Sequence, residues 1–144
     1  RVVDVDGDGP GFVRALERVD VDAVDVPVSG LAPAVAASDL VVLDASVIGP
    51  RDALVDPGGW AAAAVARASE RPVWLVGGRG RAIPAGLWPA LQRRLGGAAR
   101  APWEQDRDPL PLELVDQVAG PGGLQTVAGA LATVDTPDAA ELRR

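Results

Sequence analysis

Residues 40–77 decide the fold, and they read LVVLDASVIGPRDALVDPGGWAAAAVARASERPVWLVG. The apolar run at their start predicts a strand over 39–45 that is buried on both faces, because no polar residue alternates with the apolar ones before Asp44. An alanine-rich helix follows over 60–69, and a second apolar run predicts a strand over 72–76. Strand, helix and strand form a βαβ unit, in which the two strands are parallel. The segment therefore predicts an α/β domain.

The loop between the first strand and the helix is the expected ligand-binding region. In open α/β sheets, the loops at the carboxyl ends of the strands hold the ligand. We therefore expect Asp44, Asp52 and Gly58 to line one crevice, together with the loop that follows the second strand. Asp56 is a typical N-cap residue and Pro57 a typical first helical residue, so the helix is predicted to begin at Pro57.

The rest of the chain reads as further strands and helices of the same domain. Turn-rich segments separate the predicted strands at 1–5 and 22–26 from the predicted helices at 10–19 and 31–37. After the βαβ unit, the pattern predicts a helix over 86–95, an irregular connector over 100–111, a strand over 112–118, a turn over 120–123, and a short strand or helix over 126–132. We expect one domain over 1–144 that forms the C-terminal part of a longer protein.

Composition narrows the possible chemistry. The 144 residues include no cysteine and no histidine, and all 14 basic residues are arginine. Thiolate nucleophiles, imidazole bases, lysine Schiff bases and zinc–sulfur sites are therefore excluded for this chain. The net charge of −6 argues against a nucleic-acid partner, because lysine and arginine supply most of the affinity for phosphate backbones. Asp, Glu, Ser, Thr and backbone groups remain for acid–base and nucleophilic chemistry.

The sequence predicts neither a membrane segment nor a metal site. No apolar run is long enough to span a bilayer, and the first residues do not resemble a signal peptide, so a cytoplasmic location is expected. Acidic residues alternate over 4–9 as in a calcium loop, but the twelfth position of that loop is Ala15 rather than a bidentate acid. We expect no metal and no cofactor. Asp6 remains a candidate ligand contact, because it follows the first predicted strand.

The glycine-rich loop after the second strand of the βαβ unit has two readings. Gly77, Gly78, Arg79 and Arg81 combine free backbone amides with two guanidinium groups, which is the chemistry of a phosphate cradle. The loop has no P-loop lysine and no dinucleotide fingerprint, and it also suits an ordinary turn into the next helix. Both readings stay open from the sequence.

The order of motifs over 39–78 resembles the Rossmann-like C-terminal domain shared by the initiation factor 2B alpha, beta and delta subunits, methylthioribose-1-phosphate isomerase and ribose-1,5-bisphosphate isomerase. That family has a strand, an acidic turn, a few apolar residues, a glycine-containing loop, a helix and a Pro-Val-type strand in the same order. The resemblance implies a Rossmann-like, three-layer α/β domain with a mostly parallel sheet. It also implies a homodimer.

In the isomerases, the acid of the turn works with a cysteine. The resemblance implies Asp52 as the matching acid, with Asp44 as the other candidate base. Gly58 and Gly59 offer free amides at the expected helix start and are candidate ligand contacts together with Gly49, although Asp56 as the N-cap would place its own charge beside the two helix-start glycines. Because the cysteine and the family's N-terminal helical domain are missing from this sequence, we expect a non-catalytic ligand-binding or assembly module. An aldose–ketose isomerase that acts on a phosphorylated pentose is the alternative.

Overall fold

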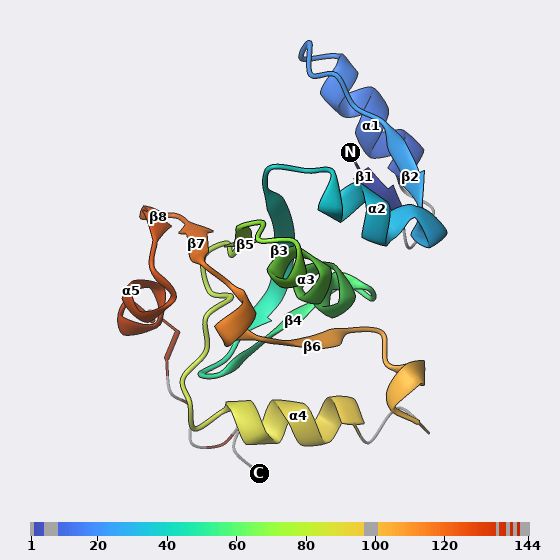
Figure 1. The fold of residues 1–144 in the computed structure, drawn as a ribbon. Coiled ribbons are helices and arrows are strands. Elements are labelled where there is room, and N and C mark those ends of the chain that lie inside the picture. Colours follow the sequence, from blue (N-terminus) through green and yellow to red (C-terminus); the bar gives the residue numbers. More distant parts are fainter. Residues whose placement is uncertain are drawn as a thin grey trace.

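Strand β3 (Val41–Ile48) lies inside a six-stranded sheet that organises the domain (Figure 1). The computed structural model describes residues 2–4, 9–96, 101–134, 136–137, 139 and 141. The strand order is β6 (Asp108–Pro111), β4 (Asp52–Val55), β3, β5 (Val73–Val76), β7 (Gln117–Gly120) and β8 (Gly123–Gln125). Two further strands, β1 (Val2–Asp4) and β2 (Asp25–Pro27), form a separate parallel pair.

Five α-helices and three short 3-10 helices connect the described strands. The α-helices are α1 (Gly9–Glu17), α2 (Leu31–Ala36), α3 (Gly59–Ala68), α4 (Trp88–Gly96) and α5 (Val127–Ala132). The 3-10 helices are η1 (Val28–Gly30), η2 (Pro102–Glu104) and η3 (Leu112–Leu114). The predicted α/β class is confirmed, and residues 126–132 form a helix rather than a strand.

The sheet is mixed, because β3 has one parallel neighbour, β5, and one antiparallel neighbour, β4. Val41 to Asp44 pair in parallel with Val73 to Val76 of β5. From Ala45 onward, β3 pairs with β4 instead, and this pairing is antiparallel. The predicted βαβ unit of β3, α3 and β5 is therefore present, with an antiparallel hairpin inserted directly after its first strand.

That hairpin corrects the expected strand and loop boundaries. β3 does not end at residue 45 but continues to Ile48, and much of the predicted ligand loop is strand β4. The hairpin forms because β4 carries apolar side chains that the core takes up: Ala53, Leu54 and Val55 are all buried. Asp44 consequently lies within a strand, at the last residue paired with β5.

Two more predictions near the C-terminal half are wrong. The expected connector over 100–111 contains η2 and strand β6, which pairs with β4. The expected strand over 112–118 begins instead as η3, and the strand β7 starts at Gln117. Pairing with β4 sets the backbone of β6, and pairing with β5 sets the backbone of β7 from Gln117 onward.

One face of the sheet carries the core. Ala62, Ala63 and Ala66 of α3 are buried against it, and their small side chains let the helix lie close to the strands. The apolar side chains that meet them point to this face from β3, β5 and β7, namely Val41, Leu43, Val73, Leu75 and Val118. Helix α5 packs on the same cluster through Val127, Ala130 and Leu131.

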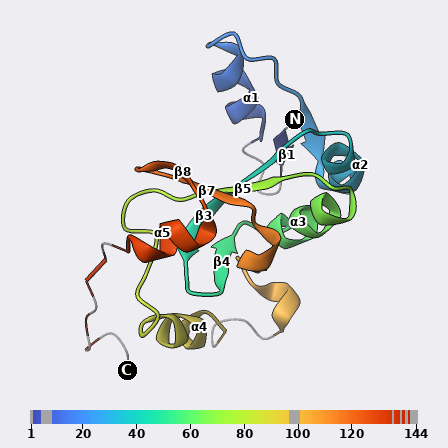
Figure 2. The same cartoon turned by 60° about the vertical axis from the view of Figure 1, so that its left-hand side comes forward.

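No described helix covers the opposite face of β3, β5, β7 and β8, as the rotated view shows (Figure 2). Alternation along the strands points five apolar residues to this side, and we call them the bare face: Val42, Trp74, Val76, Ala119 and Leu124. Val42 is 55% exposed and Leu124 is 46% exposed. Trp74 is only half-buried on this face, whereas Trp88 is buried.

Candidate functional site

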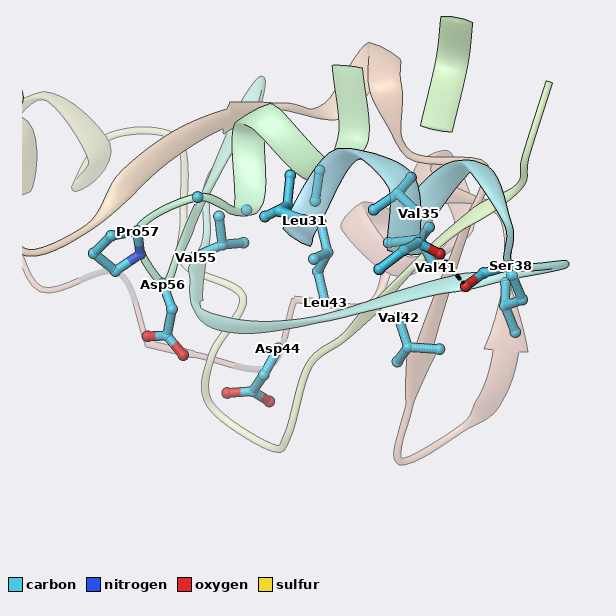
Figure 3. Close-up of a pocket in the computed structure, with 15 residues that line it drawn as sticks. Leu31, Val35, Ser38, Val41, Val42, Leu43, Asp44, Val55, Asp56 and Pro57 are labelled. Atoms are coloured by element: carbon cyan, nitrogen blue, oxygen red, sulfur yellow. Dashed lines mark hydrogen bonds between the residues drawn. The ribbon is translucent and has the colours of Figure 1, made fainter. Parts of the chain in front are cut away.

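The first cavity lies between α2, the start of α3 and the beginning of β3 (Figure 3). Its volume is about 240 Å³. Apolar side chains from α2 and β3 line most of it, and Asp44, Asp56, Gly58 and Gly59 lie around one end. Three of the predicted site residues, Asp44, Gly58 and Gly59, are therefore brought together here.

Asp108 caps the N-terminus of α3, and this corrects the expected role of Asp56. The helix begins at Gly59 rather than at Pro57, with Gly58 as its N-cap residue. The Oδ2 atom of Asp108 accepts hydrogen bonds from the amides of Gly58 at 2.9 Å and Trp60 at 3.3 Å. Strand β6 brings this carboxylate into place by pairing with β4, where Asp108 lies opposite Val55. The helix start is therefore already occupied by a negative charge, which disfavours anion binding there.

Asp56 binds Arg107 instead of the helix. Arg107 Nη1 lies 3.2 Å from Asp56 Oδ1, and Arg107 Nε donates to Ser46 Oγ at 3.2 Å. A further hydrogen bond joins Arg107 Nη1 to the carbonyl of Asp106 at 2.7 Å. Arg107 thereby links the chain before β6 to the middle of β3 and to the end of β4.

Asp44 is engaged in the same way by Arg81. Arg81 Nη1 donates to Asp44 Oδ2 at 2.6 Å and to the carbonyl of Ala45 at 2.5 Å. This ion pair joins the glycine-rich loop to β3. The contact is expected, because β3 and β5 are parallel and Asp44 lies opposite Val76, just before the loop. The site thus presents two acid–arginine pairs of zero net charge. In each pair one carboxylate oxygen is engaged by arginine, Oδ2 of Asp44 and Oδ1 of Asp56.

Asp52 and Gly49 lie at the other end of the hairpin, away from the first cavity. Asp52 starts β4 and pairs with Pro111, and the next residue, Ala53, lies opposite Ile48. At a rise of about 3.3 Å per residue, Asp52 is roughly 15 Å along the strand from Asp44. Gly49 packs against the indole of Trp88, and a Cβ atom at Gly49 would overlap that ring. The geometry gives Gly49 a packing role.

The second cavity lies where β5 and β7 end, and its volume is about 340 Å³. It is formed by the loop after β5, the β7–β8 turn and α5, with Ile48 and Val118 among its apolar lining residues. Gly77, Gly78 and Arg79 line it, so the predicted ligand residues divide between two cavities. Arg81 is part of the link between β3 and this loop.

Different structural constraints favour glycine at the positions of this loop. A Cβ atom at Gly77 would lie 2.6 Å from the Ile48 side chain, and Gly80 has a positive φ of 73° that favours glycine. Gly78 meets neither constraint, because its nearest neighbour is Arg81 at 3.7 Å. Among the described residues, no hydrogen bond uses the amides of Gly78, Arg79 or Gly80. Three successive amides of the loop that lines the cavity therefore have no partner among the described residues.

One predicted ligand contact cannot be placed. Asp6 lies outside the described residues. Within the described ranges, no group of three or more acidic side chains could hold a metal ion. None of the described helices is long and apolar enough to cross a membrane.

Sequence reasoning missed Ser46, Arg107 and Asp108. Arg107 and Asp108 stand in the segment that was predicted to be irregular, and they reach Ser46 and Gly58 only because β6 pairs with β4. The Asp-Pro pair at 108–109 resembles the one at 56–57. No local pattern distinguishes which of the two caps α3.

No family profile and no curated protein matches the sequence. Among solved structures, the chain is similar to eIF2B beta from Chaetomium thermophilum, with a TM-score of 0.66 and 21% identity over 86% of this chain and 37% of that one. It is similar to a chain of the tetrameric eIF2B-beta2-delta2 complex from C. thermophilum, with a TM-score of 0.64 and 22% identity over 85% of this chain and 39% of that one. It is also similar to 5-methylthioribose 1-phosphate isomerase from Pyrococcus horikoshii OT3, with a TM-score of 0.65 and 15% identity over 86% of this chain and 41% of that one.

The matched structures share the fold of this chain, and the chain spans less than half the length of each of them. The resemblance noted in the sequence is therefore confirmed at the level of the fold.

Proposed function

We propose, from a fold that this chain shares with eIF2B subunits and with 5-methylthioribose 1-phosphate isomerase, that it is a non-catalytic module that binds a phosphorylated small molecule and assembles with a second copy. The observation that carries the ligand-binding part is the second cavity, with three available amides and an arginine at its edge. The tetrameric state of one matched complex supports the assembly part.

The arrangement of the acids supports a non-catalytic role. Asp44 is paired with Arg81, and Asp52 lies roughly 15 Å further along the strands. An aldose–ketose isomerisation moves a proton between neighbouring carbons, so its acid and base must both reach the same two atoms. Asp44 and Asp52 do not meet that condition together, and the sequence supplies neither cysteine nor histidine to replace them.

The second cavity has the chemistry of an anion site. Successive backbone amides in a glycine-rich loop form a concave, electropositive surface, and phosphate oxygens accept several such hydrogen bonds at once. The volume of about 340 Å³ is within the range of small-molecule pockets. Its position at the ends of the parallel strands β5 and β7 is also where open α/β sheets bind ligands.

Arg79 is the cation best placed to contact the phosphate. Among the described residues it makes no ion pair, its side chain is exposed, and it lines the second cavity. Arg81 is instead committed to Asp44 and to the carbonyl of Ala45. We therefore assign the direct contact to Arg79 and the positioning of the loop to Arg81.

Calorimetric titration with ribose 5-phosphate and with inorganic phosphate tests the proposal. Wild type is expected to bind, and Arg79→Ala is expected to bind about ten- to hundredfold more weakly, because one charge-assisted contact is lost. Arg94→Ala removes the same charge from an exposed position on α4 and is the matched control, with binding like wild type. Absence of binding at millimolar ligand, or equal binding by all three proteins, contradicts the ligand role.

A further inference from the structure

The second cavity contains a polar side chain, Gln125, whose hydrogen-bonding groups are unused. Gln125 is the last residue of β8 and lies opposite Val118 of β7, so the two side chains point to the same face of the sheet. Both residues line the cavity. In the part of the chain that the structure describes, the Gln125 carboxamide forms no hydrogen bond. Its two donor hydrogens and its acceptor oxygen therefore remain available to a ligand.

The carboxamide lies between the β7–β8 turn and helix α5, which both border the cavity. A Cβ atom at Gly122, in the turn, would lie 2.6 Å from Gln125 Nε2, so glycine at this position leaves the amide nitrogen its space. A Cβ atom at Gly129, in α5, would lie 3.8 Å from Gln125 Oε1, which is ordinary van der Waals contact. The surroundings thus accommodate the carboxamide without pairing it.

The two other polar side chains among the described lining residues are used differently. Thr133 Oγ1 donates to the carbonyl of Ala130 at 3.1 Å, so its proton is engaged within the last turn of α5. Arg79 carries the positive charge and is assigned to the phosphate. Within the described lining, Gln125 is therefore the uncharged group that offers both a free donor and a free acceptor.

Gln125 is too far from the glycine-rich loop for one phosphate group to contact both. Strand β7 lies between β5 and β8, so at about 4.8 Å per strand the backbone of Gln125 is roughly 10 Å from β5. By the pairing register, Gln125 is level with Leu75, and the loop begins two residues further along, at Gly77. A phosphate on the loop amides therefore leaves the carboxamide to the organic part of the ligand.

We propose that Gln125 is a specificity-determining residue, which forms hydrogen bonds with hydroxyl groups of the phosphorylated ligand. The amides of residues 78–80 and the Arg79 guanidinium hold the phosphate, and the carboxamide reads the other end of the molecule. A carboxamide donates to one hydroxyl oxygen and accepts a proton from a second hydroxyl, so it suits the neighbouring hydroxyls of a sugar. An ester without hydroxyls leaves it unpartnered. The inference rests on the ligand-binding role proposed above.

Calorimetric titration of wild type and Gln125→Met with three probes tests this role. The probes are ribose 5-phosphate, ethyl phosphate, which is an ester without hydroxyls, and inorganic phosphate. Methionine keeps the length of the side chain and removes the amide donor and acceptor. Gln125→Met is expected to bind ribose 5-phosphate about three- to tenfold more weakly, because neutral hydrogen bonds are lost. It should bind ethyl phosphate and inorganic phosphate as wild type does.

Gln117→Met is the matched control. Gln117 lies on the neighbouring strand β7 opposite Trp74, so its side chain points to the bare face, away from the cavity. This variant should bind all three probes like wild type. Thermal unfolding of both variants checks that the fold is retained. Within wild type, tighter binding of ribose 5-phosphate than of ethyl phosphate is a second readout, and it does not depend on the stability of any variant.

The outcomes separate this inference from the proposed function. Absence of binding of every probe by wild type contradicts the ligand role as a whole. Equal binding of ribose 5-phosphate by wild type and Gln125→Met overturns the role of Gln125 and leaves the phosphate site intact. Equal weakening for all three probes also overturns it, because the carboxamide would then act on the loop rather than on the ligand. A wild type that binds ribose 5-phosphate no more tightly than ethyl phosphate overturns the selection for hydroxyls.

Discussion

Asp108 accepts a hydrogen bond at 2.9 Å from the amide of Gly58, which precedes it by 50 residues. This bond joins the edge strand β6 to the start of α3, and the same carboxylate also accepts from the amide of Trp60. The helix that separates the two parallel strands of the βαβ unit is therefore capped from outside that unit.

Replacing Asp108 tests the importance of this cap. Asp108→Ala is expected to lower the free energy of unfolding by about 0.5–2 kcal/mol, because amides at the start of α3 lose their acceptor. Asp108→Asn keeps an acceptor oxygen and should cost less. Urea unfolding measures both, with Asp106→Ala at an exposed neighbouring position as the control. A loss at Asp106 as large as that at Asp108 contradicts the capping role.

A methyl group at Gly49 is expected to destabilise the fold. A Cβ atom there overlaps the indole of the buried Trp88, so Gly49→Ala should cost about 1–3 kcal/mol in unfolding free energy. Gly11→Ala, where the added atom meets open space, should cost nothing. In a Trp88→Leu background the effect of Gly49→Ala should shrink, since the two residues are coupled. Equal effects in both backgrounds argue against this contact.

The Asp44–Arg81 pair is expected to add little to stability. Both side chains are partly exposed, at 57% and 39%, and pairs of this kind contribute about 0–1 kcal/mol. A double-mutant cycle of Asp44→Ala and Arg81→Ala measures the coupling, which should fall as salt is added. A coupling energy above about 2 kcal/mol would mean that solvent does not screen the pair.

The chain is expected not to interconvert pentose phosphates. Its two candidate bases are separated along the hairpin, and one of them is paired with arginine. A coupled assay with ribose 5-phosphate and ribulose 5-phosphate should therefore give the rate of buffer alone. Turnover above buffer that disappears in Asp52→Asn or Asp44→Asn would instead support the isomerase alternative.

Local sequence was sufficient for the βαβ unit and insufficient for the strands that pair at long range. The apolar run before Asp44 and the apolar run from Val73 to Val76 each predict a strand from their own residues. The alanines between them predict a helix. β6 has no comparable pattern, because its Asp-Pro-Leu-Pro sequence becomes a strand only by pairing with β4. The reverse happens at η3, where an apolar stretch that was predicted to be a strand forms a 3-10 helix.

The same difference applies to the candidate site. The proximity of Asp44 to the loop after β5 follows from two parallel strands that end together, and the structure shows it as an ion pair. Asp52 was expected at the same edge because the hairpin could not be read from composition. Arg107 could not be found at all, since its contacts with Ser46 and Asp56 depend on the pairing of β6.

The alanine face of α3 has a consequence for side-chain entropy. Ala62, Ala63 and Ala66 are 5%, 0% and 0% exposed, and burial costs alanine no rotamer freedom. Helix docking is therefore entropically inexpensive for the side chains, although each methyl removes only a small apolar area from water. Close approach compensates for that small area, and it leaves no space for a longer side chain. Viable variants at these three positions should be confined to glycine, alanine and serine.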